Sequence, residues 1–359
     1  MSNEVTTPAP APAQVVAAGP GPGDGAVAAP PRRRARWWKA AVPVVAVALL
    51  LALPFGVNNY IVFVASLILI YAIAALGFDI LVGWSGQIGL AHAALFGVGA
   101  YCSAILATAG VPFLLTLPLV GIVAGLVALL IGFPAIRLSG FFLAIATLAF
   151  GLVIVEVFIA GGSLTGGGSG LAVPRWSVPP LTASASLYFL VVVLVVVVHV
   201  GAWRALRGRF GRTLQAVRDL GPAVGSLGIP AVHYKLVAFV VSGFVAAVAG
   251  ALYGQLQSFI FPSMFDMNLL VPMLVMVFLG GAGTLWGPAV GATVTVVLVE
   301  LLQDLGAVQS LAYGVALMIA IGVLRGGLVS LVRELRDARW LGRLTGRRTP
   351  VSDITRRAA

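Results

Sequence analysis

Neutral polar side chains stand beside glycines at two points of an otherwise apolar chain. Ser85 and Gln87 lie in the segment 83–89, Gly-Trp-Ser-Gly-Gln-Ile-Gly, and His92 follows it. Thr284 lies in a similar segment, 280–288. Hydroxyl, amide and neutral imidazole groups form hydrogen bonds without a fixed charge, so they can line a path for a polar solute without trapping it. For His92 the alternative is a structural hydrogen bond to a neighbouring helix.

The composition of the chain predicts a membrane protein. Its 359 residues are 60% hydrophobic and 9% charged, whereas soluble domains contain about 25% charged residues. Uncharged runs cover 40–78, 236–265 and 267–299, and one membrane-crossing helix needs roughly 20 apolar residues. The alternating pattern of a transmembrane barrel is absent. We therefore expect an all-α membrane protein, a polytopic helical bundle.

Apolar runs and basic clusters together predict about ten transmembrane segments, with the N- and C-termini in the cytosol. Basic residues prefer the cytosolic side, and ten spans put the basic clusters 32–39 and 204–218, Arg137 and the C-terminal tail on that side. The expected spans are 41–55, 60–80, 88–108, 114–133, 141–160, 186–203, 236–254, 266–280, 286–303 and 310–327.

Three regions follow from this topology. Residues 1–39 form a Pro- and Ala-rich cytosolic tail that ends in basic residues, and we expect it to be disordered. Residues 40–329 form the transmembrane domain, including a cytosolic loop at 204–234, and 330–359 form a basic cytosolic tail. The net charge of +11 follows span ends and tails, so no nucleic-acid partner is expected. The lone Cys102 excludes an intramolecular disulfide and a thiolate metal site, and we expect neither metal nor cofactor.

The two glycine-rich segments favour discontinuous helices. Gly83 and Gly86 would break the first helix, and Gly281 and Gly283 the second. Asp79 is expected to cap the break at 83–86 by accepting backbone N–H bonds, although it can instead extend to the membrane interface. The alternative for both segments is a tight turn between two ordinary spans.

The chain lacks a nucleotide-binding sequence of its own. Its lysines, Lys39 and Lys235, follow Trp38 and Tyr234, so the pattern G-x-x-x-x-G-K-[ST] is absent. Transport by this chain would therefore be passive, driven by a gradient, or driven by a partner ATPase.

The long polar loop between spans carries a helical apolar stripe. The stripe has steps of three and four residues, and Gly221-Pro222 interrupts it between two expected short helices. Its members are Leu214, Val217, Leu220, Val224 and Leu227. The stripe can dock into a groove on a soluble protein, or it can pack against the chain's own span ends or lie in the lipid interface.

Several separate motifs resemble one family. The segment 75–101, which contains Asp79 and His92, closely resembles the signature of bacterial ABC-transporter permeases for branched-chain amino acids. The resemblance covers about residues 58–305 in the right order. Its further segments are 137–151, 164–171, 210–229, 234–239 and 279–291.

This resemblance implies a permease subunit in the bacterial plasma (inner) membrane, with four kinds of partner. These are a second homologous permease, two cytosolic ATP-binding subunits, an extracytoplasmic solute-binding protein and the lipid bilayer. Ala223–Gly228 resembles part of the coupling-helix motif, although Pro222 stands where the general motif has Glu. The expected ATPase-coupling residues are Leu214, Val217, Arg218, Asp219, Ala223, Leu227 and Gly228.

The leading interpretation is an ATP-driven importer of branched-chain amino acids, a transport subunit and not an enzyme. A second keeps the importer and changes the cargo to urea, short amides or small organic acids. A third is a gradient-driven secondary carrier. A fourth, an intramembrane enzyme, has little support, because His92, Glu156 and Cys102 show no nucleophile–base pattern. Glu156, Glu300 and Asp304 can attract a cationic patch on a binding protein, or they are charges at the level of the lipid headgroups that solvent stabilises.

Overall fold

The computed structural model describes residues 50–135, 138, 140–179, 181–323 and 327–329. Within them the chain is almost entirely helical. Six helical stretches are long and apolar enough to cross a membrane: Asn59–Trp84, Phe113–Ala135, Phe141–Ala160, Ala183–Arg207, Ala231–Gln257 and Pro262–Gly280. Apolar helices of this length are stable in lipid because each satisfies its own backbone groups. The chain is therefore an all-α, multi-pass membrane protein.

The longer helices follow one another through short connections. They are α2 (Asn59–Asp79), α3 (His92–Thr108), α4 (Phe113–Ala135), α5 (Phe141–Ala160), α6 (Ala183–Arg207), α7 (Arg209–Leu220), α8 (Ala231–Gln257), α9 (Met267–Gly280), α10 (Gly287–Leu301) and α11 (Gln309–Val323). Short elements join them: η1 (Leu53–Phe55), η2 (Ile80–Trp84), η3 (Gly167–Ser169), η4 (Gly221–Leu227), η5 (Pro262–Phe265) and η6 (Gln303–Val308). Strands β1 (Leu171–Ala172) and β2 (Phe259–Ile260) pair antiparallel.

Helix α8 lies at the centre of the packing. It contacts α2, α3 and α4, and the crossing with α3 is very close, because a Cβ at Gly250 would collide with the carbonyl oxygen of Phe96. A Cβ at Gly99 would collide in the same way with Ala247. Small residues at helix crossings allow such close backbone approach in membranes.

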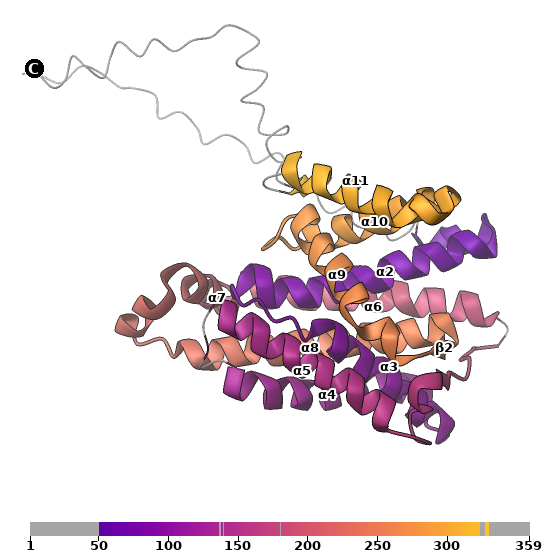
Figure 1. The fold of residues 1–359 in the computed structure, drawn as a ribbon, viewed down its shortest axis with the longest axis horizontal. Helices are drawn as coiled ribbons and strands as arrows, with labels where there is room; N and C mark the ends of the chain where they lie inside the picture. Colours follow the sequence, from indigo (N-terminus) through magenta and orange to yellow (C-terminus); the bar gives the residue numbers. More distant parts are fainter. Residues whose placement is uncertain (1–49, 136–137, 139, 180, 324–326, 330–359) are drawn as a thin grey trace, which may run out of the picture. The chain divides into compact units, whose positions relative to one another are not determined.

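The two ends of α8 lie near different features. Figure 1 shows α7 at one end of the helices and β2 at the opposite end. The chain direction agrees, since α6 runs into α7, and α8 begins after η4 and ends just before β2. The loop formed by α7 and η4, called the α6–α8 loop below, therefore lies at one end, and the β1–β2 pair lies at the other.

The predicted spans from residue 60 onward each overlap one of these helices, with small shifts at the boundaries. The first predicted span, 41–55, falls largely outside the described residues, as do Arg137 and the tails 1–39 and 330–359. The total of ten spans and the placement of the termini therefore stay predictions. Helices α3 and α10, with 17 and 15 residues, are apolar but shorter than the six long stretches.

Candidate functional site

The first glycine-rich segment interrupts the chain between α2 and α3. Helix α2 continues into η2, a π-helical turn, and the regular helix resumes only at His92. Ser85 Oγ donates a hydrogen bond to the carbonyl oxygen of Leu81 (2.7 Å). Gln87 Nε2 donates to Ser85 Oγ (2.8 Å) and to the carbonyl oxygen of Lys235 in α8 (3.1 Å). The break is thus a defined structure whose polar side chains are bonded to the protein.

The second glycine-rich segment joins α9 to α10. Gly281 and Gly283 have φ values of 114° and 74°, which side chains with a Cβ rarely adopt. Thr284 Oγ1 donates to the carbonyl oxygen of Gly281 (2.7 Å) and accepts the N–H of Gly287 (3.1 Å). The hydroxyl therefore satisfies a backbone N–H at the start of α10, as an N-cap does.

Asp79 connects the two segments. Its Oδ1 accepts a hydrogen bond of 2.7 Å from the backbone N–H of Gly283, and the residue is fully buried. The sequence predicts that Asp79 caps the break at 83–86, whereas this hydrogen bond goes to the second glycine-rich segment. The second oxygen, Oδ2, has no hydrogen-bond partner among the described residues. The carboxyl group therefore lies between the breaks as a bridge.

Arg218 extends from the end of α7 to the same place. Its Nη1 donates to the carbonyl oxygen of Gly83, and its Nε donates to Asp219 (2.8 Å). The aliphatic part of Arg218 covers Gly86, where a Cβ would collide with it. A Cβ at Gly283 would lie 3.3 Å from Arg218 Nη1. One side chain of the α6–α8 loop thus contacts the first break and lies against the second.

His92 lies apart from this bridge, at the start of α3. Its Nε2 lies 3.0 Å from the carbonyl oxygen of Ala74 in α2, and its Nδ1 lies 3.1 Å from Ser242 Oγ in α8. Because a carbonyl can only accept, Nε2 carries the proton, and Ser242 donates to Nδ1 of a neutral ring. Phe78 stacks on the imidazole with a centroid distance of 4.7 Å. The structure thus places His92 as a buried connection between three helices.

The apolar stripe of the α6–α8 loop divides between two surroundings. Leu214, Val217 and Val224 are buried against the chain itself, and Leu214 packs with residues of α2, α6 and α8. Leu220 and Leu227 are 47% and 64% exposed. The prediction that the stripe packs against the chain's own spans is therefore confirmed for the buried half, and docking of the exposed half on a soluble partner stays a prediction. The second short helix expected after Gly221-Pro222 is the 3-10 helix η4.

The remaining loop residues lie on or near the exposed half. Asp219, Ala223 and Gly228 are exposed. Gly228 has a φ of 72° and donates its N–H to the carbonyl oxygen of Gly225. This backbone geometry favours glycine at position 228, whether or not the residue contacts a partner.

Sequence reasoning missed three partners of the site. Ser242 binds His92, Thr147 Oγ1 accepts the N–H of Leu90 (2.9 Å), and the Lys235 carbonyl receives Gln87. A hydroxyl within an apolar span is a signal that could have identified Ser242 and Thr147. The Lys235 acceptor is a backbone carbonyl, which every residue has, so the residue type at that position could not identify it.

These features define the class of a multi-pass helical membrane protein whose α6–α8 loop is bonded to the glycine-rich connection between α2 and α3 and lies against that between α9 and α10. Residues 60–324 match the protein family described as branched-chain amino acid transport system / permease component, and the chain belongs to this family. Members are transport-system permeases, so the chain is a transport component and not an enzyme.

Two bacterial relatives support the assignment. The chain is 32% identical over 310 residues to the high-affinity branched-chain amino acid transport system permease protein LivM of Salmonella typhimurium. It is 32% identical over 313 residues to the protein of the same name from Escherichia coli. Each match covers 79% of this chain and 73% of the relative. No solved structure matches the chain.

Proposed function

We propose that the chain is the permease subunit of an ATP-driven importer that carries branched-chain amino acids across the bacterial plasma membrane. The family and the names of the two bacterial relatives support the cargo. The sequence has no P-loop of its own, which supports an ATPase on a partner. In this proposal the α6–α8 loop faces the cytosol, where ATP is available.

The observation that carries the proposal is the contact of Arg218 with both helix breaks. Arg218 belongs to α7, yet its guanidinium is bonded to Gly83 and lies against Gly283. A movement of α7 would therefore be transmitted directly to the connections α2–α3 and α9–α10. Coupling between distant sites needs such a physical connection to an element with two arrangements, and the glycine breaks supply flexible backbone for this.

The exposed half of the loop supplies the surface on which a partner ATPase docks. Leu220, Ala223 and Leu227 form its apolar part, with Asp219 beside them. The buried half, Leu214 and Val217, holds the loop to the membrane domain. A short helix with one face anchored and one face free can pass a displacement from the partner to the chain.

The other partners follow from the family. A second homologous permease and two ATP-binding subunits complete the membrane complex, and a solute-binding protein docks at the end opposite α7. The binding protein's pocket does most of the selection among amino acids. In this arrangement Glu156 and the loop between α5 and α6 face that protein.

Ser85, Gln87, His92 and Thr284 are the proposed polar residues of the path. Each is hydrogen-bonded to protein groups in this structure, so contact with a solute requires an exchange of these bonds. Bonds to neutral partners are worth about 1 kcal/mol each, which is small enough for such an exchange during transport.

Reconstitution tests the proposed function. The chain is placed in liposomes with its candidate permease, ATPase and binding-protein partners, and uptake of leucine, isoleucine and valine is measured with and without ATP. We expect uptake that requires both ATP and the binding protein. Uptake that ignores ATP and follows an imposed proton gradient would overturn the importer in favour of a secondary carrier.

A further inference from the structure

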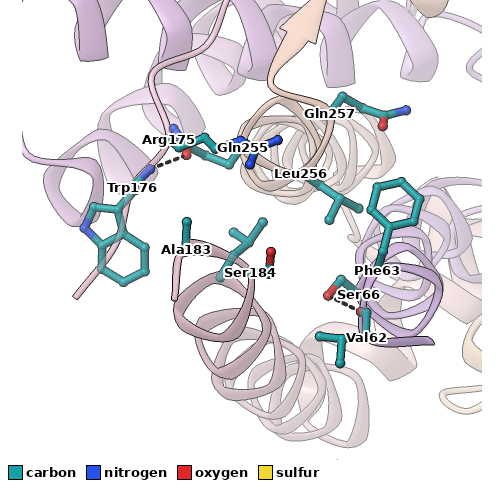
Figure 2. A pocket seen from close by; sticks show the side chains of 11 residues that line it. Val62, Phe63, Ser66, Arg175, Trp176, Ala183, Ser184, Gln255, Leu256 and Gln257 are labelled. Carbon is teal, nitrogen blue, oxygen red and sulfur yellow. Dashed lines mark hydrogen bonds between the residues drawn. The ribbon is translucent and has the colours of Figure 1, made fainter. Parts of the chain in front are cut away.

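A small cavity lies at the end of the helices opposite the α6–α8 loop. Its volume is about 240 Å³, below the roughly 300–1,000 Å³ of pockets for drug-sized ligands. It opens between the start of α2, the start of α6 and the end of α8 (Figure 2). The lining residues are Val62, Phe63, Ser66, Arg175, Trp176, Ala183, Ser184, Leu187, Gln255, Leu256 and Gln257.

Arg175 is held in place at this cavity from several sides. The buried side chain of Gln255 accepts the N–H of Trp176 and donates to the carbonyl oxygen of Pro174, both at 3.0 Å. These two bonds fix the backbone on either side of Arg175. Ser258 Oγ then accepts Arg175 Nε at 2.8 Å.

Ser258 itself adopts an unusual backbone conformation. Its φ is 62°, a value that non-glycine residues seldom take and that surrounding structure must maintain. Its carbonyl oxygen also accepts the N–H of Val173 (2.9 Å). The bend at the end of α8 therefore serves to position the segment that carries Arg175.

The guanidinium retains free hydrogen-bonding capacity. Only Nε is used among the contacts of the described residues, and Arg175 is exposed. The two terminal nitrogens of an arginine match the two oxygens of a carboxylate. No Asp or Glu lines the cavity, so the net charge of its described lining is positive.

Apolar groups complete the wall. Phe63, Leu187 and Leu256 line the cavity alongside the polar residues, and Figure 2 shows Arg175 and Phe63 on different sides of the opening. A ligand that fits this wall has one anionic end and a short aliphatic body.

We propose that this cavity is a binding site on the permease itself for the carboxylate of a small aliphatic amino acid, with Arg175 as the anion-binding residue. The identification of the ligand with the transported solute rests on the proposed function; the binding itself does not. The phosphate of an anionic lipid headgroup offers similar oxygen chemistry, and the experiment separates the two sources.

The test uses the full chain in nanodiscs of phosphatidylcholine, without ATPase or binding protein. Binding of tritiated leucine is measured by scintillation proximity. We expect saturable binding that Arg175→Gln weakens at least tenfold. The loss of one hydrogen bond between charged groups lowers an affinity by about this factor or more. Arg204→Gln, an exposed arginine near the α6–α8 loop, serves as the matched control and leaves binding unchanged.

Competition defines what the cavity recognises. Isocaproate, which is leucine without its amino group, should displace leucine, because no acid in the lining binds the ammonium. Leucinamide, which lacks the carboxylate, should not. Ser184→Trp fills the cavity without removing any bond of Arg175 and should also abolish binding, which covers the case in which Arg175→Gln fails to fold.

The lipid arm repeats the titration with phosphatidylglycerol and follows a spin-labelled form of this lipid. We expect the affinity for leucine to change less than about twofold. Absence of leucine binding in both lipids, together with lipid immobilisation that Arg175→Gln removes, would make the cavity a headgroup site and overturn the proposal. Equal leucine binding by wild type and Arg175→Gln would overturn it as well. ATP-driven uptake by a chain that shows no such binding would overturn the binding site and still support the proposed importer, so the two proposals are tested independently.

Discussion

Asp79 Oδ1 accepts the backbone N–H of Gly283 at 2.7 Å, across 204 residues of sequence. This bond joins the interruption after α2 to the interruption between α9 and α10. Asp79 is fully buried and Gly283 is half-buried, so loss of the acceptor would leave the N–H of Gly283 without this partner.

Substitution of Asp79 tests this bridge. Asp79→Ala should lower the stability of the chain by about 1–3 kcal/mol, the cost of leaving a buried hydrogen-bonding group unpaired. Asp79→Asn keeps an acceptor oxygen of the same reach and should lose less. Thermal unfolding in detergent, followed by tryptophan fluorescence, measures the difference. Equal losses for Ala and Asn would show that the carboxyl oxygen at Gly283 contributes nothing.

Substitution of Arg218 should lower uptake without lowering ATP hydrolysis. Arg218→Gln removes the bond to Gly83 while leaving the exposed apolar residues of the loop in place. In the reconstituted complex we expect ATP hydrolysis to continue and leucine uptake to fall about tenfold or more. Arg218→Lys, which keeps the charge but not the fork of donors, should lie between. A parallel fall of hydrolysis and uptake, or loss of the assembled complex, would place Arg218 at the docking surface instead.

Leu227 should be required for docking of the ATPase. Leu227→Asp puts a charge on an exposed apolar side chain of η4, so co-purification of the ATPase should be lost while the chain still inserts and stays monodisperse. Leu301→Asp, at an exposed position of α10, is the control and should co-purify normally. Gly228→Asp is a poorer test, because its φ of 72° adds backbone strain to any lost contact. Normal assembly of Leu227→Asp would reduce the loop to a membrane-surface element.

His92 and Ser242 should be energetically coupled. Their 3.1 Å contact joins α3 to α8, and each buried partner satisfies the other. A double-mutant cycle with His92→Leu and Ser242→Ala should give a coupling free energy of about 1 kcal/mol from unfolding in denaturing detergent. A coupling near zero would show that the hydroxyl and the imidazole act independently.

Gly250 should tolerate no side chain. Gly250→Ala would force α8 away from Phe96 in α3, and overpacking of this kind costs typically 1–3 kcal/mol. Gly201→Ala in α6 has open space at the Cβ position and should be neutral or slightly stabilising through helix propensity. The two melting temperatures, measured side by side, decide whether helix proximity or helix propensity controls the effect.

The local parts of this fold could be predicted from the sequence, and the bridging parts could not. Runs of apolar residues predict the helices, because a bilayer sets the length and the composition of every helix that crosses it. Glycine clusters at 83–89 and 280–288 similarly located the connections between α2 and α3 and between α9 and α10. The partner of Asp79, however, is a backbone group far along the chain, and periodicity reports only neighbours within a few turns.

The α6–α8 loop shows the same limit within a single stripe. Spacing identified Leu214 and Leu227 as members of one stripe and located the break at Gly221-Pro222. It could not show that Leu214 is buried and Leu227 exposed, because the packing of η4 depends on its direction after Gly221, which periodicity does not give. The bond of Arg218 to the carbonyl oxygen of Gly83 could likewise not be predicted from spacing, because its acceptor lies 135 residues away in the chain.

The bond between Asp79 and Gly283 has a consequence for evolutionary comparison. Because the donor is a main-chain N–H, no side chain at position 283 contributes to the bond, and the φ of 74° there favours glycine. The residue type at position 283 therefore has no side chain that could vary together with the residue at position 79. Statistical covariation across homologous genes would therefore detect a persistent acid with no correlated partner, and the connection between the two halves of the permease would become visible only in three dimensions.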